Sequence, residues 1–113
     1  MIGYSRGDVV LINFLFADGT GTKRRPAVIM SSDAYHAGRA EVIIAAITSR
    51  TDRLLPGDHL IKDWDGAGLL FPSVATGIIR TIKLDMITRK LGAMSTSDMN
   101  AINRELKVAL GLT

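Results

Sequence analysis

In the first half of the chain, apolar runs alternate with polar stretches that contain glycine. The segments Val9 to Phe16 and Glu41 to Ser49 are rich in β-branched residues, and Asn13 is the one polar side chain within the first of them. Runs of this kind are typical of strands that are covered on both faces. We therefore predict two buried strands, the second of which ends at Thr48. A third strand is expected over Pro26 to Met30, because proline is tolerated at the first position of a strand.

Glycine and polar residues mark the connections between these strands. Residues 17–23 include Asp18 and two glycines, a composition that favours a flexible hairpin loop. The stretch that begins at Ser31 is interpreted as a polar connection. The remaining predictions concern short elements, namely strands near 58–62 and 77–83 and turns at 56–57 and 64–68.

Apolar side chains change to a helical spacing near the end of the chain. In residues 97–110 they recur every three or four positions, as on the buried face of an amphipathic helix. Ser95 followed three residues later by Asp98 resembles a capping box, and Gly111 is suited to end the helix. The pattern as a whole predicts one mainly β domain over residues 1–113, with a strongly bent antiparallel sheet or open barrel closed by this C-terminal helix.

Composition narrows the possible chemistry. The 113 residues include no cysteine, which excludes disulfides, thiolate zinc sites and cysteine nucleophiles. The first residues lack the basic start and apolar core of a signal peptide. The longest apolar run, Val42 to Ile47, is far shorter than the roughly 20 residues that cross a bilayer. We therefore expect a cytoplasmic protein without a membrane anchor.

The net charge favours a polyanionic partner. The formal charge is +3 at pH 7 and the isoelectric point is about 9.6. The basic residues cluster at 23–25, at Arg50 with Arg53, and over 80–90. If the fold gathers these clusters on one face, they form a surface that binds phosphate groups.

Several short motifs follow one another along the chain: Gly7-Asp8-Val9-Val10, Arg24-Arg25-Pro26-Ala27-Val28, Ala45-Ala46-Ile47-Thr48-Ser49, Gly68-Leu69-Leu70 with Pro72-Ser73, Arg80-Thr81-Ile82 and Arg89-Lys90-Leu91-Gly92. In both order and spacing these motifs resemble those of the MazF/PemK toxins, an mRNA-interferase family of type II toxin–antitoxin systems. The resemblance covers nearly the whole chain and implies an SH3-like small barrel and a homodimer. It also implies sequence-biased, metal-independent cleavage of single-stranded RNA and neutralisation by a cognate antitoxin.

The same resemblance assigns catalytic roles to Arg25 and Thr48. Cleavage of RNA by its own 2′-hydroxyl gives a 2′,3′-cyclic phosphate and needs proton transfers and stabilisation of a negatively charged phosphorane. A guanidinium that binds two phosphate oxygens in a bidentate manner supplies that stabilisation, and Thr48 would donate a hydrogen bond to the same phosphate. No cofactor or metal is expected, since the Asp63-Trp64-Asp65 loop is a weak metal signal. The candidate substrate-binding residues are Asp18, Lys23, Arg24, Ser49, Arg50 and Arg80.

The sequence departs from the family pattern at two positions. Some relatives carry an acid at the position of Gly77 and an arginine at that of Ala75, so the agent that accepts the proton is missing. The imidazole of His36 or of His59 could accept a proton, but neither residue lies at a family catalytic position. The alternative is therefore a weakly active or inactive member that acts as an RNA-binding or protein-binding module.

Other features leave further alternatives open. A topoisomerase poison of the related CcdB type is disfavoured, because it would carry a tryptophan near its C-terminus and this chain ends Leu110-Gly111-Leu112-Thr113. Phe16, Trp64 and Phe71 are candidates for stacking on RNA bases, although core packing is the favoured interpretation for Phe16. Trp64 in particular either covers a groove or packs at an interface.

Overall fold

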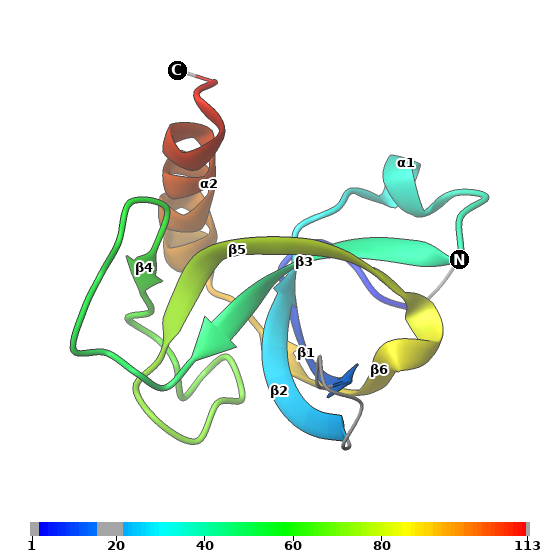
Figure 1. Cartoon of the computed structure of the whole chain (residues 1–113), viewed down its shortest axis with the longest axis horizontal. Helices are drawn as coiled ribbons and strands as arrows, with labels where there is room; N and C mark the ends of the chain where they lie inside the picture. Colours follow the sequence, from blue (N-terminus) through cyan, green and yellow to red (C-terminus); the bar gives the residue numbers. More distant parts are fainter. Residues whose placement is uncertain (1–2, 16–21, 113) are drawn as a thin grey trace.

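Six strands form one antiparallel sheet in the order β4-β5-β3-β2-β1-β6 (Figure 1). The computed structural model describes residues 3–15 and 22–112. Within those residues no pairing joins the edge strands β4 and β6, so the predicted barrel remains an open, bent sheet. The strands are β1 (Asp8–Leu15), β2 (Thr22–Ile29), β3 (Glu41–Thr48), β4 (His59–Leu60), β5 (Val74–Lys83) and β6 (Ile87–Ala93); the helices are α1 (Asp33–His36), the 3-10 turn η1 (Leu84–Met86) and α2 (Thr96–Leu110).

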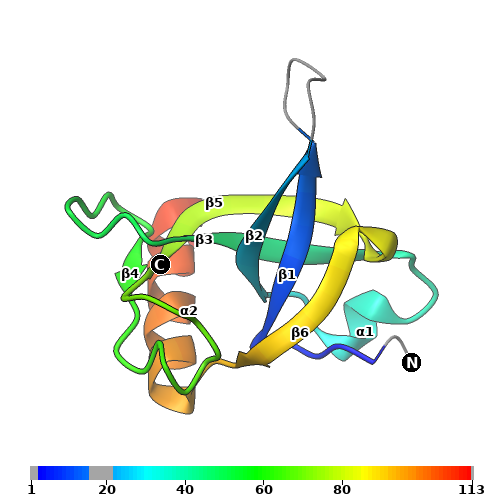
Figure 2. The ribbon, with the colours of Figure 1, turned by 90° about the horizontal axis from the view of Figure 1, so that it is seen from below.

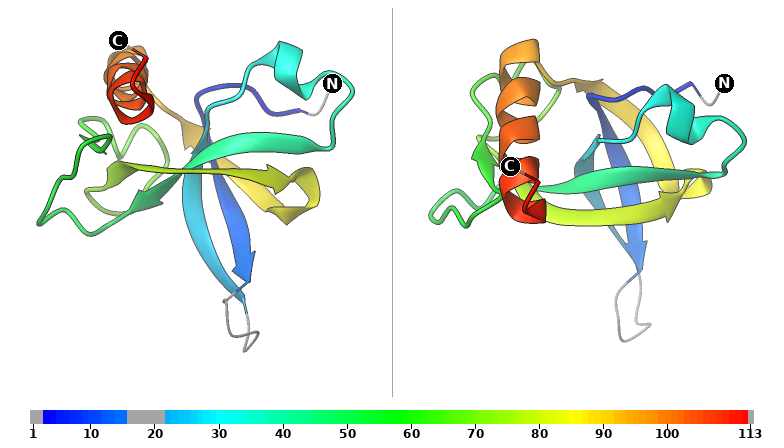
Figure 3. Two further views of the ribbon diagram at one scale, coloured as in Figure 1. Left: turned by 45° about the horizontal axis from the view of Figure 1, so that its top comes forward. Right: turned by 90° about the horizontal axis from the view of Figure 1, so that it is seen from above.

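The central strands are covered on both faces, as their apolar composition predicts. Val9 and Val10 are both fully buried, yet they belong to two different clusters, because successive strand residues point to opposite faces. One cluster includes Val28 and Ile47 and reaches Ile102 of α2. The other contains residues of β1, β2, β3 and β5. In the ribbon, β1, β2 and β6 run across β3 and β5 (Figures 2 and 3).

The C-terminal helix forms where helical spacing predicts it. The Ser95 side chain caps its N-terminus by accepting a hydrogen bond of 3.1 Å from the Asp98 backbone N–H. Gly111 ends it with a left-handed φ of 68°, a conformation that favours glycine. The helix packs against β4 and β5. In the part of the chain that the structure describes, no helix combines the length and apolarity needed to cross a bilayer.

Two strands begin earlier than predicted. β2 starts at Thr22, and Pro26 lies inside it opposite Leu11 of β1. The proline is tolerated there because pairing of β2 with β3 begins only at Ala27, one residue later. β5 starts at Val74, so the predicted strand near 77–83 is its second half.

The strand β6, the helix α1 and the 3-10 turn η1 were not predicted. β6 reads Ile-Thr-Arg-Lys-Leu-Gly-Ala and mixes charged with apolar residues, as suits an edge strand that exposes most of its side chains. The one-turn helix α1 occupies the segment interpreted as a polar connection, where the Ser32 side chain caps it. The polar stretch at 64–68 is a turn as predicted, and Trp64 packs against the core cluster of α2. Phe16 and Asp18 lie outside the described residues.

Candidate active site

Arg25 and Thr48 come together at one cleft of the sheet. Arg25 lies on β2 and pairs with Ile12 of β1, and Thr48 ends β3, two residues beyond Ala46, where the pairing of β2 with β3 stops. Arg25 and Thr48 both line a cleft of about 500 Å³ that also involves β6 and the loop between β4 and β5. The lining residues are Leu11, Arg24, Arg25, Pro26, Ile47, Thr48, Ser49, Gly68, Leu69, Leu70, Phe71, Ser73, Arg89 and Leu91.

Three arginines give this cleft a positive potential. Arg24 and Arg25 reach it from β2 and Arg89 reaches it from β6, and all three side chains are exposed. No carboxylate of the described residues lines the same cleft to neutralise them. Guanidinium groups remain protonated at neutral pH and match the geometry of phosphate oxygens. The cleft is therefore suited to hold an anionic backbone.

Thr48 is held so that its hydroxyl proton remains available. It ends β3 and is half-buried, and its Oγ1 accepts a hydrogen bond of 3.1 Å from the backbone N–H of Arg50. Because a hydroxyl both accepts and donates, this contact fixes the oxygen while the O–H can donate to a ligand. Ser49 lines the cleft beside it and is exposed.

Thr48 also lines a second cleft, of about 360 Å³, on the side of β5. Arg50, Arg53, Asp58 and Gly77 contribute to this cleft. The Arg50 Nε lies 3.1 Å from Asp52 Oδ1, and this hydrogen bond lowers the pKa of Asp52. Both side chains are largely exposed, so the ion pair is weak and Arg50 can exchange Asp52 for another anion.

A carboxylate from another segment lies at the position where Gly77 lacks one. Asp58 Oδ1 accepts a hydrogen bond of 2.9 Å from the backbone N–H of Gly77, and its Oδ2 accepts one of 2.9 Å from Leu55. Asp58 and Thr48 line the same cleft. No local sequence pattern indicates this placement, because Asp58 and Gly77 are brought together by the pairing of β4 with β5. Ala75 is buried and lines neither cleft, and its methyl side chain has no polar group.

Other predicted substrate-binding residues lie elsewhere. Lys23 is exposed on β2 but lines neither cleft. Arg80 lies on β5 opposite Ile44, outside both clefts. Asp18 is outside the described residues. Conversely, sequence reasoning missed Arg89, although it stands in one of the motifs, because the strand that carries it was not predicted.

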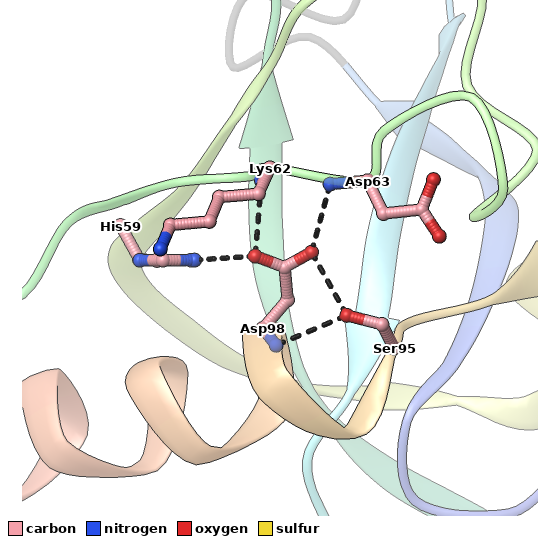
Figure 4. Close-up of polar contacts among 5 residues, drawn as sticks. All are labelled: His59, Lys62, Asp63, Ser95 and Asp98. Carbon is pink, nitrogen blue, oxygen red and sulfur yellow. Dashed lines mark hydrogen bonds and ion pairs between the residues drawn. The ribbon is translucent and has the colours of Figure 1, made fainter.

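The histidines have structural partners away from the clefts. His36 Nε2 lies 2.5 Å from the Ser31 hydroxyl oxygen, and the residue is buried at the end of α1. His59 Nε2 donates a hydrogen bond of 2.8 Å to Asp98 Oδ1 (Figure 4). Neither histidine lines the clefts at Thr48. The structure therefore gives no support to either as a base at that residue.

Asp98 is the hub of a buried polar network (Figure 4). Beyond His59 it accepts hydrogen bonds from the backbone N–H groups of Lys62 and Asp63, at 2.9 and 3.0 Å, and one from the Ser95 hydroxyl. Burial raises the pKa of Asp98, but these hydrogen bonds outweigh it and lower the pKa to about 2. The network ties β4 and its following loop to the start of α2.

The described residues contain no group of three or more histidine, cysteine, aspartate or glutamate side chains arranged to hold a metal ion. In the Asp63 to Asp65 loop, Asp63 Oδ1 instead accepts a hydrogen bond of 3.1 Å from the Gly66 backbone N–H. This carboxylate is a turn-forming group.

Residues 5–110 match the model of the PemK-like, MazF-like toxins of type II toxin–antitoxin systems. A mycobacterial endoribonuclease solved in complex with its cognate antitoxin is 29% identical, with a TM-score of 0.78 and 98% of each chain covered. A second mycobacterial endoribonuclease is 28% identical, with a TM-score of 0.75, covering 96% of this chain and 91% of its own. MazF of a MazE–MazF complex from Deinococcus radiodurans shares the fold at 21% identity, with a TM-score of 0.79 and coverage of 97% and 98%. No protein with a curated description matches the chain.

Proposed function

Because the chain belongs to the PemK-like, MazF-like toxins of type II toxin–antitoxin systems, we propose that it is an endoribonuclease that cleaves single-stranded RNA without a metal. The observation that carries this proposal is that Arg25 and Thr48 line one cleft, together with two further arginines. The mycobacterial relatives named as endoribonucleases support the same activity. The cleft is open, so a flexible strand could enter it more easily than a duplex.

The proposed reaction is an internal transesterification. The 2′-oxygen bonds to phosphorus and loses its proton to a base, while the bond from phosphorus to the 5′-oxygen breaks and that oxygen gains a proton. The product ends are a 2′,3′-cyclic phosphate and a 5′-hydroxyl. Arg25 binds two phosphate oxygens and stabilises the charge that grows on them, and the Thr48 O–H donates to the same group.

We assign the acceptance of the 2′-hydroxyl proton to Asp58. Among the described residues, Asp52 and Asp58 are the carboxylates that line the clefts, and Asp52 pairs with Arg50. Each oxygen of Asp58 already accepts one backbone N–H but keeps a second lone pair. Asp58 would thus replace the acid that other family members carry at the position of Gly77.

The partners follow from the same family membership. We propose that a cognate antitoxin covers the arginine-lined cleft and competes with RNA, in line with the relatives solved with an antitoxin. An acidic segment would complement Arg24, Arg25 and Arg89. We further propose that the protein acts in the cytoplasm as a homodimer.

Cleavage in the presence of EDTA tests the activity and the site together. Purified protein is incubated with a mixed-sequence single-stranded RNA beside Arg25→Ala and Arg104→Ala variants, and the product ends are analysed. Arg104 is exposed on α2 and lines neither cleft, so its variant removes one positive charge without touching the site. We expect cyclic phosphate ends from the wild type and from Arg104→Ala, and loss of cleavage in Arg25→Ala.

One observation favours a second candidate, a binding protein without activity. Both oxygens of Asp58 serve as acceptors within the turn at 55–58 and for Gly77, which is also what a purely structural carboxylate would do. In that case the folded wild type would bind RNA or antitoxin but leave varied RNAs intact in the same assay.

A further inference from the structure

The loop between β4 and β5 exposes two large apolar side chains at the edge of the candidate active site. Leu70 is 83% exposed and Phe71 is 62% exposed, and both line the cleft that holds Arg24, Arg25 and Arg89. Large apolar side chains left in water beside a polar cleft indicate a contact surface. The reaction proposed above makes no use of these two side chains.

The backbone holds this loop in place without help from the two side chains. Gly68 has a φ of +84°, and a Cβ built on it would lie 2.1 Å from the Leu91 carbonyl oxygen. A Cβ on Gly92 would lie 2.5 Å from the Ala67 carbonyl oxygen, so the loop backbone and β6 are in direct contact. The Leu69 N–H also donates to the Trp64 carbonyl at 3.0 Å.

Phe71 itself is fixed by a local hydrogen bond. The Ser73 hydroxyl, which is buried, donates to the Phe71 carbonyl oxygen at 2.7 Å. The ring is therefore presented from a positioned backbone rather than from a side chain packed into the core. A ligand that covers the ring would lose little conformational entropy of the loop on binding.

We infer that Phe71 is a stacking platform for one base of the substrate strand, next to the phosphate held by Arg25. This inference rests on the proposed RNA substrate. An exposed aromatic ring beside guanidinium groups is the combination by which proteins hold single-stranded nucleic acid, because the ring stacks on a base while the arginines hold the backbone. A purely apolar protein partner would leave the three arginines uncompensated. Leu70 lies alongside and widens the apolar surface under the base.

The test measures binding of a mixed-sequence single-stranded RNA whose 2′-hydroxyls are methylated, since such an RNA cannot cleave itself. Phe71→Ala is expected to weaken binding about 5- to 150-fold, the effect of losing one base–aromatic stack. Phe71→Trp should bind RNA like the wild type. Phe71→Leu should bind RNA almost as weakly as Phe71→Ala, because leucine keeps an apolar group but has no ring. Leu110→Ala is the matched control, because Leu110 is 56% exposed on α2 and lines neither cleft.

Steady-state cleavage of unmodified RNA adds a second readout. Phe71→Ala should raise KM while kcat changes little, because a stack that forms on binding persists through the reaction. Unchanged binding by Phe71→Ala, or full binding by Phe71→Leu, would overturn the inference. The inference would also be overturned if Phe71→Ala lost self-association in sedimentation but kept its affinity for RNA, since the surface would then be a protein interface. If the wild type neither binds nor cleaves RNA, the proposed function itself is wrong; if the wild type cleaves and Phe71→Ala matches it, only the inference on Phe71 is wrong.

Discussion

Replacing Asp98 by asparagine should make the protein less stable at neutral pH and remove part of its sensitivity to acid. Asp98 is 1% exposed and joins His59, the loop after β4 and the N-terminus of α2. Asparagine has the same shape, but it replaces one acceptor oxygen by a donor and carries no charge. At least one buried N–H or O–H group of the network then loses its partner, which costs on the order of 1–3 kcal/mol.

The pKa of Asp98 gives an independent magnitude. Its pKa falls from 3.8 to about 2 on folding. At about 1.4 kcal/mol per pKa unit, the ionised carboxylate stabilises the folded state by about 2 kcal/mol. Because the folded pKa is the lower one, this stability is fully present above pH 4 and is lost as the pH falls through 2. Stability should therefore decline with acid in this window.

Urea unfolding of the wild type and of Asp98→Asn at a series of pH values between 2 and 7 measures both effects. The difference in unfolding free energy between the two proteins should be largest at neutral pH and should shrink by about 2 kcal/mol toward pH 2. Taking the difference removes the contribution of carboxylates that titrate equally in both. A constant difference across the range would refute the reasoning, because Asp98 would then have the same pKa folded and unfolded.

Three further substitutions test the site and its support. Arg25→Lys keeps the charge but loses the two-pronged contact, so cleavage should fall by about ten-fold or more; an unchanged rate would contradict the role of the guanidinium. Asp58→Asn should lower the cleavage rate by roughly 100-fold or more, and Gly77→Asp in the same variant should restore part of it, since a Cβ at Gly77 meets only ordinary contacts of 3.4 Å or more. An unchanged rate in Asp58→Asn would show that another group accepts the proton. Gly68→Ala should lower the melting temperature far more than Gly38→Ala, because both glycines have a positive φ but of the two only Gly68 lies against another backbone segment. If calorimetry gave equal decreases in melting temperature, the strain of the positive φ alone would account for both.

The parts of the fold that follow from strong local patterns were predictable. The strand at 41–48 and the helix at 96–110 appear where the apolar pattern sets them, with Ser95 and Gly111 at the ends of the helix. The family resemblance read from the motifs is confirmed by the match over residues 5–110. These features depend on neighbouring residues in the sequence, which a single sequence displays directly.

The parts that depend on tertiary pairing were not predictable. β6 has the composition of an exposed segment and is a strand only because β1 offers it a partner. Arg89 reaches the cleft that Arg25 lines because β6 pairs with β1. In the same way, Asp58 comes to Gly77 through the pairing of β4 with β5, across a sequence gap that no local pattern reports.

Close packing of the turn at 55–58 against β5 brings the Asp58 carboxylate to position 77. Gly57 has a φ of +97°, and a Cβ built on it would lie 3.3 Å from the Gly77 Cα and 3.1 Å from the Ala109 Cβ. A side chain at Gly57 would therefore crowd the approach that lets Asp58 accept the Gly77 N–H. A Cβ at Gly77, in contrast, would meet only ordinary contacts of 3.4 Å or more. Asp58 reaches the backbone of β5 without an acid on that strand, which is why Gly77 alone is a poor argument for an inactive protein.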